Sequence, residues 1–193
     1  MSGKFIVLYG INNLGKSTQA KLLVDYLNKL GKEAIYLKYP IYDLEPTGPK
    51  LNSILREGKK VSAQEMQETY AQNRRDYEPQ LIQMIKEDKI IVGEDYTGTG
   101  LAWGMAHGVS LEVLEEMNKD LLREDLSILL EGDRFMNSQE KNHLHESDNE
   151  LTKRCRQTHL QLSKKYNWPI INANQSIDQV HQSIVELVNQ ILS

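Results

Sequence analysis

The sequence predicts an α/β fold of three layers, in which helices cover both faces of a five-stranded parallel sheet. Five apolar runs of strand length recur along the chain, and stretches with helical periodicity separate them. Strands that alternate with helices are typical of parallel sheets buried on both faces. The chain has 193 residues, of which 39% are hydrophobic, enough for a substantial core. We therefore expect a single domain over residues 1–193.

The expected strands are the short apolar runs. They comprise residues 4–9 (KFIVLY), 33–39 (EAIYLKY), 89–93 (KIIVG), 126–132 (LSILLEG) and 168–174 (WPIINAN). The first run is followed by an apolar helical stripe, which Gly31 ends as a C-terminal stop; it consists of Ala20, Leu23, Val24, Leu27 and Leu30. Further helical stretches are expected at about 46–56, 63–86, 111–122, 149–166 and 177–192.

Charge and cysteine content exclude several classes of protein. The formal net charge is −4 and the pI is about 5.8, which argues against a protein that binds nucleic acid through a surplus of lysine and arginine. No apolar run approaches the length of a membrane span, and the first run is too short for a signal peptide. The single cysteine, Cys155, cannot form an internal disulfide. These observations predict a soluble protein of a reducing cytoplasm.

A glycine-rich loop between the first strand and the first helix carries the clearest chemical signal. Gly10, Gly15, Lys16 and Ser17 satisfy the pattern G-x-x-x-x-G-K-[ST] in its proper strand-to-helix context. Such a loop turns its backbone N–H groups toward phosphate oxygens, and the helix N-terminus adds unpaired donors and partial positive charge. Lys16 would reach the β and γ phosphates, and Ser17 would hold Mg²⁺. The sequence therefore predicts that this loop binds a nucleoside triphosphate with Mg²⁺. A P-loop alone does not separate a P-loop kinase from a GTPase or another NTPase, so the acceptor half of the sequence must decide between them.

The segment QETYAQNRRDYEPQL supplies a candidate binding face. Tyr70, Asn73, Arg74 and Tyr77 fall at i, i+3, i+4 and i+7, on one side of a helix. This face could stack a nucleobase on Tyr70 and hydrogen-bond its edge with Arg74. Spacing alone equally allows a half-buried helix whose tyrosines fill the core and whose arginine pairs with an acid.

Several segments together resemble the thymidylate kinase family, in order and spacing over nearly the whole chain. They are the P-loop from residue 10, KYP at 38–40, YAQNRR at 70–75, EDYTGTGLAW at 94–103, LTKRCRQTHLQL at 151–162 and NANQSIDQVHQSI at 172–184. The resemblance implies transfer of the γ-phosphoryl group of ATP to dTMP, giving dTDP. It also implies a five-stranded parallel sheet and a homodimer.

Matching the family's motifs residue by residue implies roles for individual side chains. Tyr70 stands where the family has an aromatic ring that stacks on thymine, and Arg74 where an arginine reads the base. Trp103 stands where an aromatic side chain crowds the sugar and disfavours a 2′-hydroxyl. Asn12 occupies the position of an aspartate that contacts the deoxyribose.

The resemblance thus implies two sets of binding residues and a small catalytic set. The ATP site would comprise Gly10, Asn13, Gly15, Lys16, Ser17, Thr18, Arg154 and, bordering the adenine, Asn172, Ala173 and Asn174. The acceptor site would comprise Asn12, Tyr39, Pro40, Tyr70, Asn73, Arg74, Asp95, Tyr96, Thr99 and Trp103. The catalytic residues would be Lys16, Glu94 and Lys141, with Ser17 and Glu94 holding the metal.

The sequence departs from the family pattern after the third expected strand. The family usually has Asp-Arg-Tyr there, whereas this chain has Glu94, Asp95 and Tyr96, so an arginine that grips phosphate is replaced by an acid. We expect Glu94 to hold the metal through water, because it ends a strand beside the P-loop. The alternative for these carboxylates is to cap the helix that follows.

A second family arginine, which follows the second strand, is also missing. Tyr42 stands where the family has this arginine. The candidates to replace the charge of the missing arginine are Arg75, Lys38 and Arg56. These two losses make the acceptor harder to assign than the donor.

The polar segment 133–148 is expected to form a lid. The P-loop has Asn13 where some family members have an arginine, so the lid would supply the cation that stabilises the transferred group. Lys141 and Arg134 are the candidates, with Arg154 and Arg156 behind them, although each could equally be a solvated surface charge.

Two other functions stay open at this point. The missing arginines and the Glu94–Asp95 pair would also suit a kinase of another deoxynucleotide or of a deoxynucleoside, whose 5′-hydroxyl proton an acid could accept. The chain could also be a regulatory P-loop module that binds ATP without turnover.

Overall fold

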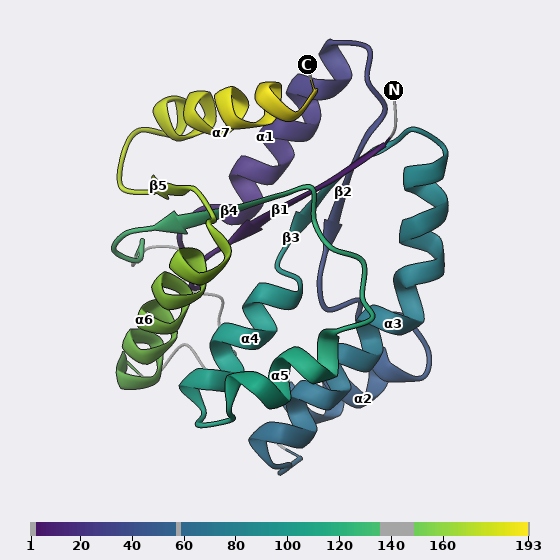
Figure 1. Cartoon of the computed structure of the whole chain (residues 1–193), viewed down its shortest axis with the longest axis vertical. Coiled ribbons are helices and arrows are strands. Elements are labelled where there is room, and N and C mark those ends of the chain that lie inside the picture. The colour runs from purple at the N-terminus through teal and green to yellow at the C-terminus, as the bar shows by residue number, and fades with distance from the viewer. Residues whose placement is uncertain (1–2, 57–58, 136–148, 193) are drawn as a thin grey trace.

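The structure, a computed structural model, describes residues 3–56, 59–135 and 149–192 and has the predicted α/β architecture (Figure 1). Five strands form one sheet in the order β2-β3-β1-β4-β5, and every neighbouring pair is parallel. The strands are β1 (Lys4–Tyr9), β2 (Ala34–Lys38), β3 (Ile90–Glu94), β4 (Leu126–Glu131) and β5 (Ile170–Asn172). Each coincides with or overlaps the apolar run that predicted it.

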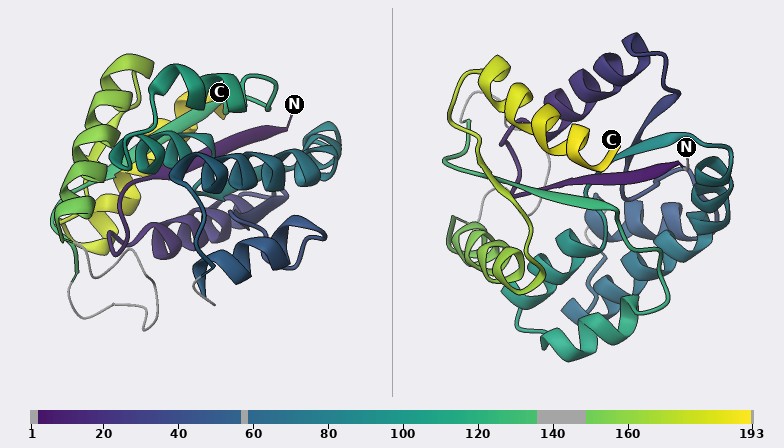
Figure 2. Two further views of the ribbon diagram at one scale, coloured as in Figure 1. Left: turned by 90° about the horizontal axis from the view of Figure 1, so that it is seen from below. Right: turned by 45° about the horizontal axis from the view of Figure 1, so that its top comes forward.

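Helices lie on both faces of the sheet, so the three predicted layers are confirmed. They are α1 (Lys16–Lys29), α2 (Thr47–Leu55), α3 (Ala63–Lys86), α4 (Thr97–Ala106), α5 (Leu111–Asn118), α6 (Asn149–Tyr166) and α7 (Ile177–Leu192). Helices α1 and α7 pack side by side on one face, whereas α3, α4 and α6 cover the other (Figures 1 and 2). Among the described helices, none combines the length and apolar content that crossing a bilayer requires.

The side chains of the central strand β1 are buried on both faces of the sheet. Ile6 and Leu8 pack in the cluster that contains the apolar residues of α1 and α7, whereas Phe5 and Val7 pack in the cluster that contains Leu81 of α3. All four β1 side chains are fully buried. Because successive strand residues point to opposite faces, a continuous apolar run is buried only when both faces are covered.

Helix α4 is not predicted by hydrophobic periodicity, although the capping alternative for Glu94 and Asp95 places a helix after them. No side chain caps its N-terminus. Its sequence, TGTGLAWGMA, has three glycines and no apolar stripe, so neither propensity nor periodicity indicates a helix. Tertiary packing decides instead. Thr158 of α6 donates a hydrogen bond of 2.8 Å to the carbonyl of Ala102, and a Cβ on Gly98 would lie 2.8 Å from Cζ of Tyr9. The glycines therefore let α4 lie close to its neighbours.

Helix α5 ends one turn before the expected residue 122. Asn118 closes it, because its Nδ2 donates to the carbonyl of Leu114 at 2.7 Å. The backbone N–H of Leu122 donates to the Glu78 carboxylate of α3 instead of continuing the helix. The apolar pattern of this segment therefore continues beyond the helix itself.

Asn73 of α3 fixes the loop that follows β2. Its Oδ1 accepts a hydrogen bond from the backbone N–H of Ile41 at 2.8 Å, and its Nδ2 donates to the Ile41 carbonyl at 2.9 Å. Nδ2 also lies 3.0 Å from Oγ1 of Thr47, at the start of α2. Asn73 is fully buried. One amide thus holds the β2 loop, α2 and α3 in a fixed arrangement.

We expect Asn73→Ala to lower the free energy of unfolding by about 1–3 kcal/mol, because the backbone groups of Ile41 would lose their partner in a partly buried loop. Gln72→Ala is the matched control, since the Gln72 amide contacts Asp76 on the exposed side of α3. The control should change stability by less than about 0.5 kcal/mol. Equilibrium unfolding in urea measures both, and equal losses would contradict the role of Asn73.

Candidate active site

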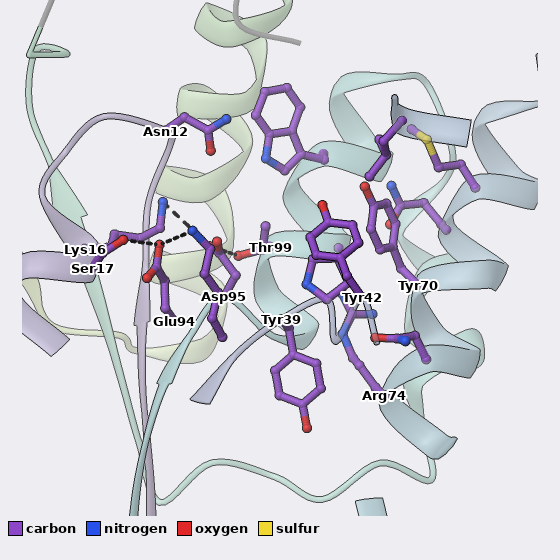
Figure 3. Close-up of a pocket in the computed structure, with 18 of the residues that line it drawn as sticks. Asn12, Lys16, Ser17, Tyr39, Tyr42, Tyr70, Arg74, Glu94, Asp95 and Thr99 are labelled. Atoms are coloured by element: carbon purple, nitrogen blue, oxygen red, sulfur yellow. Dashed lines mark hydrogen bonds and ion pairs between the residues drawn. The ribbon is translucent and has the colours of Figure 1, made fainter. Parts of the chain in front are cut away.

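A cavity of about 460 Å³ lies at the carboxyl edge of β1, β2 and β3, bounded by α3 and α4 (Figure 3). Many of the residues that the sequence predicted for the two substrates line it together. They are Asn12, Asn13, Gly15, Lys16, Ser17, Thr18, Tyr39, Pro40, Tyr70, Asn73, Arg74, Glu94, Asp95, Thr99 and Trp103. The cavity therefore joins the phosphate-binding loop to the aromatic face of α3.

The P-loop is shaped by residues in the left-handed region. Gly10 has φ +139° and Gly15 has φ +80°, and a Cβ on Gly10 would lie 2.5 Å from the carbonyl oxygen of Leu130. Helix α1 begins directly after Gly15, so its first N–H groups face the loop. Lys16 lies buried beneath the loop and donates to the carbonyls of Gly10 (2.9 Å) and Ile11 (3.0 Å).

Glu94 lies at the end of β3, between the P-loop and β2. Its Oε1 accepts a hydrogen bond from Ser17 Oγ at 2.8 Å and lies 3.2 Å from Lys38 Nζ, and Tyr36 donates to its other oxygen. Burial alone would raise the pKa of Glu94, but Lys16, Tyr36, Lys38 and Ser17 together hold that pKa below its usual value. Glu94 is therefore an anionic, tightly held carboxylate.

Asp95 points into the same cavity and has the opposite electrostatic behaviour. Thr99 donates to its Oδ1 at 2.7 Å, and Lys16 Nζ lies 3.7 Å from that oxygen. Burial raises the pKa of Asp95, and the charge of Glu94 adds to the rise against the attraction of Lys16. Its backbone φ is +61°, which is uncommon for a residue with a side chain. The chain thus holds a second acid beside Lys16, where the family pattern has an arginine.

Arg74 lies at the other end of the cavity, in a buried and fixed position. Its Nη1 donates to Oδ1 of Asn118 at 3.1 Å, and its guanidinium lies 5.9 Å above the ring of Tyr96. Burial lowers the pKa of Arg74 from its usual value. Tyr70 lines the cavity on the same face of α3 (Figure 3). An aromatic ring and a buried cation therefore share one wall, as a base-binding site requires.

The structure separates the three candidates for the missing arginine charge. Lys38 and Arg56 line the cavity, and Arg56 packs over the ring of Tyr42 at 5.0 Å. Arg75 is not among the lining residues and donates to the carbonyl of Met117. Of these three candidates, Lys38 and Arg56 thus line the cavity and Arg75 does not.

Other predicted residues lie elsewhere. Tyr96 is fully buried beneath the cavity, where its ring contacts Phe5 and Tyr39 at 5.0 Å each. Gly10, the first residue of the P-loop, is buried and does not line the cavity, and Arg154 is an exposed residue of α6. Lys141 lies outside the described residues.

The adenine-border residues Asn172, Ala173 and Asn174 follow β5. Asn174 bonds the backbone of Asp133 twice, at 2.6 and 2.8 Å, so this segment lies beside the start of the expected lid. Of the lid itself only residues 133–135 are described, and the N–H of Phe135 donates to the carbonyl of Asn13 at 2.9 Å.

Sequence reasoning missed several residues that line the cavity, among them Gln67, Gly100 and His107. Gln67 could have been found, because it precedes Tyr70 by three residues and Arg74 by seven and so shares their helix face. Gly100 and His107 belong to or follow α4, the helix that the sequence pattern did not reveal.

Known proteins are similar to this chain over most of its length. A family model described as "Thymidylate kinase" matches residues 8–184. The "Probable thymidylate kinase" of Thermococcus gammatolerans is 32% identical, over 97% of both chains. The "Thymidylate kinase" of Schizosaccharomyces pombe is 26% identical, over 98% of this chain and 93% of the relative.

Solved structures show the same fold. The thymidylate kinase of Candida albicans has a TM-score of 0.79 at 22% identity, covering 98% of this chain and 92% of that chain. The thymidylate kinase of Ehrlichia chaffeensis has the same TM-score at 17% identity, covering 98% and 99%. The family model, the full-length relatives and the fold agree with the resemblance of the motifs, and the chain belongs to the thymidylate kinase family.

Proposed function

We propose that this chain is a dTMP kinase, which transfers the γ-phosphoryl group of ATP to dTMP and gives ADP and dTDP. One observation carries the proposal: a single cavity connects the P-loop with the wall formed by Tyr70 and Arg74. Phosphoryl transfer needs donor and acceptor in line, and a shared cavity allows that. Family membership supports the same reaction. The homodimer, the lid and the cytoplasmic location stay predictions from the sequence.

The P-loop and the residues beside it would bind the donor. The loop N–H groups and Lys16 would hold the triphosphate, and residues 172–174 with Arg154 would border the adenine. Ser17 Oγ and Glu94 Oε1 lie 2.8 Å apart beside the loop, and two such oxygens suit Mg²⁺. Ser17 and Glu94 would therefore hold the metal, which would offset the negative charge of the phosphate groups.

The wall between α3 and α4 would bind the acceptor. The base would stack on Tyr70, Trp103 would crowd the sugar, and Arg74 would contact the base edge. The acceptor phosphate would then lie toward Lys38, the cavity cation that contacts Glu94 at 3.2 Å. Asn12, Tyr39, Pro40 and Thr99 complete the lining on this path.

A second candidate function rests on Asp95. An acid beside the transferred group repels a phosphate dianion but could take the proton of a nucleoside 5′-hydroxyl. The alternative is therefore a deoxynucleoside kinase.

We expect Lys16→Met to lower kcat at least about a hundredfold, because the Lys16 contact strengthens as charge develops on the transferred group. Lys29→Met is the control, since Lys29 lies exposed at the far end of α1. Formation of dTDP from dTMP and Mg·ATP, followed by chromatography, measures both. A loss smaller than about threefold for Lys16→Met would count against phosphoryl transfer at this loop.

We expect Asp95→Asn to lower the KM for dTMP about three- to tenfold, because it removes a negative charge that faces the acceptor phosphate at an effective dielectric of about 20. The amide can still accept the hydrogen bond from Thr99. Steady-state kinetics with dTMP and with thymidine checks this. If the variant instead loses thymidine phosphorylation by orders of magnitude, Asp95 is a base and the deoxynucleoside kinase replaces our proposal.

A further inference from the structure

The amide of Gln67 lies in the wall of the cavity without a protein partner. The residue is only 3% exposed, and it lines the cavity one turn before Tyr70. No hydrogen bond joins its side chain to any other residue in the described ranges 3–56, 59–135 and 149–192. An amide that lines a cavity without a protein partner is free to bind a group that enters the cavity.

Gln67 and Arg74 form a matched pair on one face of α3. They lie seven residues apart, two helical turns, with Tyr70 between them. Opposite them on α4 lie Gly100 and Gly104, which are one helical turn apart. A Cβ on Gly100 would come within 2.8 Å of Arg74 Nη2, and one on Gly104 within 3.2 Å of Gln67 Cγ. The close approach of α4 thus leaves room for two polar side chains beside one aromatic ring.

The two side chains have different hydrogen-bonding capacities. Arg74 has only donors, and Nη1 is already committed to Asn118 at 3.1 Å, so its remaining donors can bind only an acceptor such as a carbonyl oxygen. Gln67 offers an acceptor oxygen as well as donors. A base that fits both presents a carbonyl oxygen next to a ring N–H.

We propose that Gln67 is a specificity-determining residue, whose Oε1 accepts the ring N–H of a base while Arg74 donates to the neighbouring carbonyl oxygen. This inference rests on the proposed function, because it takes the ligand of the cavity to be a nucleotide base. Thymine and uracil present this carbonyl and N–H pair. Cytosine presents an amino donor and a ring acceptor instead, and Arg74 has no acceptor for the amino group.

Gln67→Met tests the proposal, because methionine keeps the length of the side chain and removes the amide. We expect the KM for dTMP to rise about tenfold, with the KM for ATP unchanged. The ratio of kcat/KM for dTMP to that for dCMP should fall about tenfold. Gln64→Met is the matched control, because Gln64 lies exposed near the start of α3 and its amide donates to Glu68. The control should change none of these values.

A modified acceptor tests the same contact in the unaltered protein. In N3-methyl-dTMP a methyl group replaces the ring N–H proton, while both carbonyl oxygens stay acceptors. With wild-type enzyme we expect the KM for this analogue to be about tenfold higher than the KM for dTMP. With Gln67→Met the two acceptors should have equal KM values, because the variant has already lost the contact. Equal KM values of the two acceptors with wild-type enzyme would overturn the proposal. So would a variant in which the effect of the substitution and the effect of the modified base on KM multiply.

The outcomes also separate this inference from the function on which it rests. If the wild-type enzyme forms no dTDP from dTMP, the proposed function fails. If it forms dTDP and Gln67→Met leaves the KM and the dTMP to dCMP ratio unchanged, only the role of Gln67 fails. A lower melting temperature with equal rises in both KM values would also overturn it, since that pattern marks a structural residue.

Discussion

The parallel register of β3 with β1 and β2 is the constraint on which the site depends. It pairs Glu94 with Leu8 on one side and with Lys38 on the other, so three strand ends meet at one edge. The P-loop that follows β1 therefore brings Ser17 to 2.8 Å from Glu94. The carboxyl ends of parallel strands share one edge of the sheet, so strand pairing alone brings the P-loop and Glu94 together.

The charge pattern around Lys16 distinguishes this chain from the family pattern. Lys16 lies near two acids whose pKa values shift in opposite directions: that of Glu94 is lowered and that of Asp95 is raised. Besides these two acids, the cavity is lined by the cations Lys16, Lys38, Arg56 and Arg74. This arrangement is compatible with the roles that we propose for Arg74 and Tyr70, and it offers Lys38 and Arg56 as cations for an acceptor phosphate.

The sequence predicted most of the fold, since the strands are continuous apolar runs and the P-loop spacing is read directly from residues 10–17. Periodicity did not reveal α4, because its closely packed glycines lower helix propensity and leave no apolar stripe. For the site, residue type and spacing predicted Lys16 and Glu94, and the family resemblance predicted Arg74, but neither predicted the burial of Tyr96 or the position of Gln67. Those depend on how α3 and α4 approach each other, which only tertiary packing decides.

The central claim is that the cavity binds a deoxynucleoside monophosphate and ATP together for transfer. Release of ADP from Mg·ATP, measured in parallel with dTMP, dUMP, dGMP, dCMP, dAMP, UMP and thymidine, tests it most directly. The account predicts turnover with dTMP and weaker turnover with dUMP. Turnover with thymidine alone, or with no acceptor at all, would contradict it.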